Sequence, residues 1–359
     1  MDNTQKKLNA YISETQYIAE KVLRTIDKNA WFKIIPSIDI GIPYDVDRLA
    51  GGFPTGIFVE WSCKIPIIPI DTTVNCCTAS VFSLSSNCDD ELFKNNLLKL
   101  NEKWKNSSYL LNFDRGNHFI SLCSNDRGNR FLVMHSTAKE FTRGYNGLYP
   151  IKDNWYYDKI KVIDCEGRYF RYIQGKEAEL FMKTAISLNN FNEIRHENIA
   201  FSLLENCSCI LETKHFHHYG MTEPESIQIG CYRVCEGDIF PIFSKPNYSI
   251  DMYRVKCCSR LNSKGEYIVP HGWGKHFVED TDIKIDLKRK IINIGNYERK
   301  LFCDATLYDL PNVEYRDFEE IDGKNGFYMY YINELEGMVE DVYNQNICLT
   351  SNGIREIRR

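Results

Sequence analysis

Residues 267–276 of the chain read Tyr-Ile-Val-Pro-His-Gly-Trp-Gly-Lys-His. A short β-like approach ends at His271, glycines follow at 272 and 274, and Lys275 stands four residues after the histidine. Glycine lets the backbone come close to a ligand, and a neutral imidazole nitrogen is a competent covalent nucleophile. The pattern therefore indicates a histidine that contacts a phosphate, with Lys275 holding the phosphate charge. The alternative is an ordinary turn that carries a surface histidine.

The composition is that of a globular protein with a sizeable core. The chain has 359 residues, of which 43% are hydrophobic and 26% are charged, and this length suits one large domain. Because the net charge is -5, any contact with nucleic acid has to come from a local basic groove. No run reaches the ~18 apolar residues of a membrane span. We therefore expect a cytoplasmic protein with no membrane partner.

Hydrophobic periodicity predicts an α+β fold. Apolar residues at helical spacing predict helices over 5–27, 89–105 and 176–204, and the last of these is expected to bury Leu180 and Phe181. Short runs of β-branched and aromatic residues between turn residues predict strands, within 31–59, 65–77, 113–122, 131–136, 210–220, 229–270 and 281–302. Residues 145–174 show no clear period and are expected to be irregular. One domain covering 1–359 is the simplest organisation.

Cysteine and histidine side chains at expected strand ends form a candidate metal site. The candidate ligands are Cys76, His118, His135 and either His217 or His218. Thiolate and imidazole ligands suit borderline metals such as manganese, zinc or cobalt. The alternative for each histidine is a hydrogen-bonded structural role. Cys76 and Cys77 are also consistent with two packed, reduced cysteines.

The order of the motifs resembles that of the RtcB family of RNA ligases along most of the chain. Gly-Asn-His-Phe at 116–119 and His-Gly-Trp-Gly-Lys at 271–275 are similar to two of its signatures. The other stretches that resemble family segments, in the same order, are 50–56, 67–76, 134–136, 190–195, 217–219, 240–256 and 309–317.

This resemblance implies an RtcB-like domain with mixed β-sheets flanked by helices around a central cleft for metal and nucleotide. The segment 303–359 would close the nucleotide pocket. One or two manganese ions, with zinc or cobalt as alternatives, and GTP are the implied cofactors. The implied metal ligands are Cys76, His118, His135, His217 and His218, and the implied nucleotide contacts are Asn117, Ser244, Lys245, Gly272, Gly274 and Lys275.

The implied reaction is GTP-dependent RNA ligation. His271 would form a histidine-GMP intermediate that activates an RNA 3′-phosphate, or 2′,3′-cyclic phosphate, for joining to a 5′-hydroxyl in RNA repair or tRNA splicing. RNA ends are thus the expected partner, and an activating protein remains an open possibility. Arg115, Arg143, Lys245, Lys275 and the basic tail at 355–359 are the candidate RNA contacts.

The chain also departs from the family pattern. Thr73 replaces a metal-binding carboxylate, although Asp71 lies nearby, and Ser121 and Lys275 replace an acidic residue and an arginine. Residues 349–353 contain no lysine where the family has one in its nucleotide pocket. Two alternatives therefore remain beside the ligase. One is a catalytically silent protein that binds RNA ends, and the other is a metal-dependent phosphoesterase that uses metal-bound water.

Overall fold

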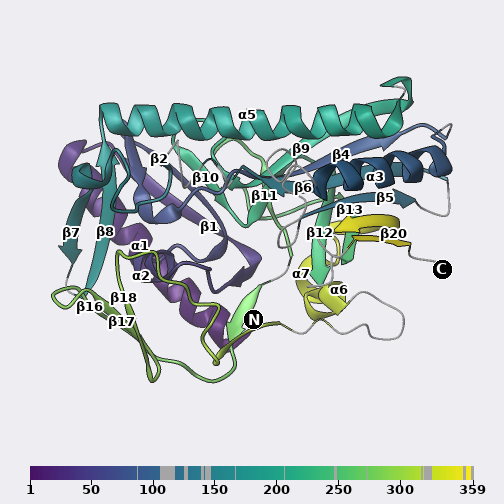
Figure 1. The fold of residues 1–359 in the computed structure, drawn as a ribbon. Coiled ribbons are helices and arrows are strands. Elements are labelled where there is room, and N and C mark those ends of the chain that lie inside the picture. The colour runs from purple at the N-terminus through teal and green to yellow at the C-terminus, as the bar shows by residue number, and fades with distance from the viewer. Residues whose placement is uncertain are drawn as a thin grey trace.

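The main feature of the molecule is a curled antiparallel β-sheet with helices around it (Figure 1). The computed structural model describes residues 1–86, 88–105, 118–124, 128–138, 141, 147–165, 167–205, 207–245, 249–272, 274–316, 318, 326–350 and 353–356. The sheet follows the order β1-β2-β10-β9-β4-β6-β5-β20-β13-β12, and β21 pairs with β20. We expected mixed sheets, but every strand pairing in the described part is antiparallel.

The strands of this sheet are mostly short. They are β1 (Trp31–Gly41), β2 (Thr55–Ser62), β4 (Cys77–Leu84), β5 (Phe119–Ser124), β6 (Arg130–Thr137), β9 (Ile210–Gly220), β10 (Ser226–Ile229), β12 (Ile239–Lys245), β13 (Ser249–Val255), β20 (Val339–Thr350) and β21 (Gly353–Glu356). The C-terminal β20 lies between β5 and β13. The segment Val339–Thr350 is therefore built into the main sheet.

Four smaller sheets complete the β-structure. They comprise β3 (Ile67–Pro69) with β8 (Arg168–Gln174) and β7 (Lys161–Cys165); β11 (Cys231–Val234) with β14 (Tyr267–Pro270); β15 (Lys275–Phe277) with β19 (Val313–Tyr315); and β16 (Ile283–Asp286), β17 (Ile291–Ile294) and β18 (Tyr297–Lys300). The expectation that residues 145–174 are irregular was therefore wrong for β7 and β8. Residues 169–173 of β8 are buried in a continuous run that includes Arg171, so no two-residue period marks this strand.

The three predicted helices are confirmed, with ends that differ by at most two residues. The helices are α1 (Asn3–Ile26), α2 (Val46–Gly51), α3 (Asp90–Lys105), α5 (Lys176–Leu204), α6 (Gly326–Tyr330) and α7 (Ile332–Leu335), and the short 3-10 turns are η1 (Ile70–Thr72), η2 (Tyr157–Lys159) and η3 (Cys207–Cys209). Asp2 and Gln5 form a capping box that begins α1. Among the described helices, none combines the length and the apolar character that crossing a membrane requires.

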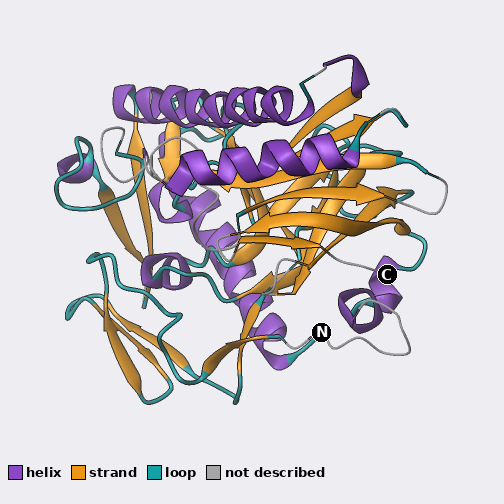
Figure 2. Cartoon of the chain, turned by 45° about the vertical axis from the view of Figure 1, so that its right-hand side comes forward, coloured by secondary structure: helices purple, strands orange, loops and turns teal. Residues whose placement is uncertain are grey.

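Both long helices after α1 lie on one side of the main sheet (Figure 2). The amide of Asn96 on α3 donates to the carbonyl of Leu203 on α5 at 3.1 Å, so the two helices are side by side. Phe82 and Leu132 of the sheet belong to the core cluster beneath them. The opposite side of the same strands, with Val81, forms another cluster with the last strands of the sheet. This second cluster surrounds the candidate site.

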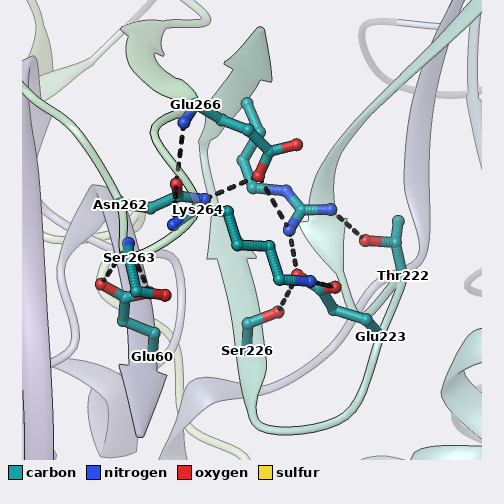
Figure 3. A network of polar contacts seen from close by, with 9 residues as sticks. Glu60, Thr222, Glu223, Ser226, Asn262, Ser263, Lys264 and Glu266 are labelled. Carbon is teal, nitrogen blue, oxygen red and sulfur yellow. Dashed lines mark hydrogen bonds and ion pairs between the residues drawn. The ribbon is translucent and has the colours of Figure 1, made fainter.

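A polar network fixes the loop that leads into β14 and then to His271 (Figure 3). Glu60, on β2, accepts hydrogen bonds from the Ser263 amide at 3.1 Å and the Ser263 hydroxyl at 2.7 Å. Glu266 accepts from the Asn262 amide at 2.7 Å and forms an ion pair with Arg233 at 3.3 Å. The loop is thereby bonded to both β2 and β11 before the chain reaches the candidate site.

Candidate metal centre and nucleophile loop

Three buried side chains from neighbouring strands converge on one point. The Cys77 thiol lies 2.9 Å from Nε2 of His135, and this nitrogen lies 3.1 Å from Nε2 of His218. The three ligand atoms all lie within 4.8 Å of one another. In the part of the chain that the structure describes, no other group of three His, Cys, Asp or Glu side chains has this spacing. We call this group the Cys-His-His cluster.

The alternation of side chains along β-strands brings Cys77 and His135 together. Cys77 and Ala79 point to the same face of β4, because side chains two apart share a face. Ala79 pairs directly with His135 on β6, which makes His135 the diagonal neighbour of Cys77. Diagonal neighbours on one face are within reach of long side chains.

A β-bulge selects His218 over His217. Cys77 pairs with Tyr219 and Thr78 pairs with His217, so His218 is the extra residue on β9, and bulges re-aim side chains in this way. His217 points to the other face, where Nδ1 lies 2.9 Å from the Thr78 hydroxyl and Nε2 lies 2.5 Å from a Glu193 carboxylate oxygen on α5. His217 therefore lies outside the cluster, and the alternative His218 belongs to it.

The thiol of the cluster is Cys77 rather than the predicted Cys76. Cys76 has φ of 55°, a left-handed conformation at the turn that precedes β4. Its buried Sγ lies 3.7 Å from the carbonyl oxygen of Ala185 on α5. Since adjacent residues cannot both face the cluster here, the turn directs Cys76 toward α5 and Cys77 toward His135.

His118 lies beside the cluster without joining it. The residue is buried just before β5, and its ring centroid is 5.5 Å from that of His135. The two rings meet edge to face. His118 is therefore a neighbour of the three converging atoms.

The donor atoms of the cluster fit a transition-metal ion. Bond lengths of about 2.0–2.3 Å and tetrahedral angles would separate neighbouring ligand atoms by about 3.3–3.6 Å, close to the distances found here. Burial, with the neighbouring rings of His135 and His271, lowers the pKa of His218 well below its usual range. A ligand imidazole must be neutral, and burial favours that form. Cys77, His135 and His218 can therefore hold such an ion.

The predicted nucleophile His271 lies next to this cluster. Its ring centroid is 5.5 Å from that of His218, and the residue is buried. Nδ1 lies 3.3 Å from Oδ2 of Asp39, and the same oxygen accepts a hydrogen bond from the Gly272 amide at 2.9 Å. One carboxylate on β1 thus holds both the ring and the backbone of the loop.

Gly272 is required by the close approach of two backbones. Its φ is 89°, and a Cβ at this position would lie 2.3 Å from the carbonyl oxygen of Phe243. The Phe243 amide donates to the carbonyl of His271 at 2.8 Å. β12 therefore sets the position of the loop, and any side chain at 272 would displace it.

The predicted phosphate contact Lys275 is surrounded by aromatic rings. Nζ lies 4.0 Å from the ring centroid of Tyr308 and 4.4 Å from that of Tyr315. Burial lowers the pKa of Lys275. Gly274 leaves room for the guanidinium of Arg316, because a Cβ there would lie 2.4 Å from its Nη1. Lys275 is thus a desolvated cation close to the nucleophile loop.

Several other predicted contacts involve residues whose side chains the structure does not describe. Asn117, Arg115, Arg143 and residues 357–359 lie outside the described residues. For Ser244 and Lys245 the structure describes only the backbone, in β12. The predicted nucleotide and RNA contacts at these positions stay predictions.

Asp71, the proposed substitute for the family's metal carboxylate, has a different partner. One of its oxygens lies 3.3 Å from Nη1 of Arg171, which also contacts Asp47 at 3.1 Å. Burial raises the pKa of Asp71 to about 8. Thr73 donates its hydroxyl hydrogen to Asp45 at 3.1 Å. Neither Asp71 nor Thr73 is part of the Cys-His-His cluster.

Asp39 is the residue of the candidate site that sequence reasoning missed. It lies within the apolar run Ile-Asp-Ile-Gly-Ile at 38–42 and is 1% exposed. A single carboxylate in an apolar strand is costly unless it has a partner. This was the available signal, and it would have marked Asp39 without naming His271 as the group it contacts.

No protein-family model matches the chain, and a search of curated proteins finds no match. The resemblance to RNA ligases therefore stays a prediction.

Proposed function

We propose that the chain is a metal- and GTP-dependent RNA ligase that acts through a histidine-GMP intermediate on His271. The observation that carries this proposal is the position of His271, whose Nδ1 faces the buried Asp39 carboxylate while its ring lies beside His218 of the Cys-His-His cluster. The resemblance of the sequence motifs supplies the identity of the nucleotide and of the RNA ends.

Asp39 would prepare His271 for attack. With Nδ1–H donating to Oδ2 of Asp39 at 3.3 Å, the lone pair is on Nε2, and the ring is held in one tautomer. In the proposed step Nε2 attacks the α-phosphorus of GTP. A nitrogen–phosphorus bond forms, and the bond to pyrophosphate breaks with its electron pair on the leaving group.

Other residues of the site would bind the phosphates. The backbone at Gly272 is held by Asp39, and the desolvated ammonium of Lys275 provides positive charge four residues after the nucleophile. A manganese ion bound by Cys77, His135 and His218 would stabilise the negative charge that develops during phosphoryl transfer. In the second half of the reaction an RNA 3′-phosphate oxygen would displace His271, and a 5′-hydroxyl would then displace GMP.

Intact-protein mass spectrometry tests the proposal. The wild type is incubated with manganese and GTP, beside His271→Ala and the control His276→Ala. His276 is a suitable control because it lies in β15, directly after the loop, and contacts the surface residue Glu314 at 3.6 Å. We expect a GMP-sized mass increase in the wild type and His276→Ala only. An adduct on His271→Ala, or no adduct in a folded sample with bound metal, contradicts the proposal.

One observation favours a second candidate, a metal-dependent phosphoesterase. Three protein ligands with an open fourth position are typical of sites that activate water, and the Cys-His-His cluster supplies three. In this case His271 would orient the phosphate without forming a bond to it. Hydrolysis of a phosphoester with no adduct on His271 would distinguish this function from ligation.

A further inference from the structure

The outer face of α5 carries a stripe of exposed apolar residues. The described helices and strands leave this side of α5 uncovered at one edge of the molecule (Figures 1 and 2), and the described residue Phe141 contacts it, with a ring centroid 5.2 Å from that of Phe191. Four large side chains of the stripe are exposed to between 39% and 57%: Leu180, Phe191, Ile194 and Phe201. Leu180 was expected on the buried side of the helix, and its exposure corrects that expectation.

The stripe has the spacing of a coiled-coil seam. Successive positions alternate by four and three residues, through Leu180, Thr184, Ser187, Phe191, Ile194, Asn198 and Phe201. A mean period of 3.5 residues keeps such a stripe facing a partner helix. The inner face of α5 is also apolar and packs on the sheet, so folding of one chain does not account for the outer stripe.

The central residues of the seam are self-complementary in size when two copies of α5 run antiparallel. A two-fold axis midway between Ser187 and Phe191 places Phe191 of one copy over Ser187 of the other. The same register places Ile194 over Thr184 and Asn198 over Leu180. In each of the first two layers a large side chain therefore meets a small one, as close packing requires.

A surface groove lies at the seam positions where this register requires room for large side chains of the second copy. The groove has a volume of about 450 Å³ and is lined by Phe141, Lys183, Thr184, Ser187, Leu188 and Phe191. Thr184 and Ser187, the two small seam residues, form part of its wall. The groove can therefore accept Ile194 and Phe191 of a second copy.

The charges beside the seam agree with the same register. Lys183 and Glu197 lie on one flank of the helix, and antiparallel pairing brings Lys183 of one copy close to Glu197 of the other. Glu197 is 41% exposed even with its contact to His215. With roughly 150–250 Å² for a full aromatic side chain, the four apolar side chains of the stripe expose on the order of 350 Å² of surface per copy. A stable interface buries about 1,200 Å² in total over the two copies, and flanking residues along the helix would supply the remainder.

We propose that α5 is the interface of a homodimer, in which the helices of two copies pack antiparallel along this seam. Symmetric interfaces of this kind use the same patch on both copies. The proposal does not depend on the reaction at His271, since the Cys-His-His cluster lies on the opposite side of the sheet from α5.

Sedimentation velocity of the full chain tests the dimer. At micromolar protein concentrations we expect the wild type to sediment as a particle with twice the 42.0 kDa mass of one chain. Ile194→Asp should raise the dimer Kd by about 100-fold or more, because it buries an unpaired charge in the seam. The control Val278→Asp changes another half-exposed apolar residue, away from α5, and should leave Kd unchanged.

A size-based variant checks the register. Ser187→Phe fills the place proposed for Phe191 of the second copy, so it should also weaken the dimer, and its exposed position leaves the fold of the single chain intact. Circular dichroism verifies folding of each variant. A wild type that stays monomeric at roughly 100 µM, or a dimer that Ile194→Asp does not weaken, overturns the proposal.

Discussion

Replacement of Cys77 by alanine should abolish metal binding at the Cys-His-His cluster. The change removes one of three converging ligand atoms and leaves two imidazoles, whose Nε2 atoms are 3.1 Å apart. Two nitrogen ligands hold a borderline metal far more weakly than a thiolate with two imidazoles. We therefore expect about one manganese or zinc ion per wild-type chain and none above background on Cys77→Ala.

The size of the effect on stability follows from linkage. A metal at about 100 times its Kd stabilises the folded chain by about 2.7 kcal/mol. An unfolding entropy of about 2.1 cal/mol/K per residue corresponds to about 0.75 kcal/mol/K for 359 residues. The added metal should therefore raise the wild-type Tm by about 3–4 °C, whereas Cys77→Ala should show no rise.

Cys76→Ala is the matched control for this experiment. Cys76 is the adjacent buried cysteine, and its Sγ faces the carbonyl of Ala185 rather than the cluster. Its loss should lower the Tm of the metal-free protein but leave the metal-induced rise unchanged. Thermal melts with and without metal, combined with elemental analysis, measure both quantities. A rise that persists in Cys77→Ala and disappears in Cys76→Ala would refute the assignment of the thiol.

Two further predictions concern stability. Burial raises the pKa of folded Asp71 from 3.8 to about 8, so the folded chain binds one more proton than the unfolded chain between these pH values. The free energy of unfolding should therefore fall as the pH rises through this range, by up to about 1.4 kcal/mol per pH unit. Asp71→Asn should lessen this decline in urea titrations at pH 5 and 7.5, and an unchanged pH dependence would contradict the buried protonated state. Gly272→Ala should lower the free energy of unfolding by at least about 2 kcal/mol, because the strain of a left-handed backbone adds to a clash with the Phe243 carbonyl. Gly265→Ala, at φ of 80° in open space, should cost only about 1 kcal/mol, and equal losses in the two variants would exclude the clash.

Local pattern was sufficient for the helices and for most of the strands. The predicted helix 176–204 matches α5 because its apolar residues recur at helical spacing and glycine stands just before it. The same pattern predicted that Leu180 is buried, whereas it is exposed. A helix with two apolar faces does not reveal from its sequence which face meets the sheet. The strands β7 and β8 were missed because the buried run of β8 has no alternation.

The sequence by itself determined that a glycine-rich loop presents His271 after a strand, and that cysteine and histidine stand at the ends of other strands. Only the tertiary structure decided which of these residues meet. The choices between Cys76 and Cys77 and between His217 and His218 depend on a turn and a bulge, because a shift of one residue reverses the face of a β-strand. The contact between Asp39 and His271 joins residues 232 positions apart, and no local pattern encodes a pairing over that separation.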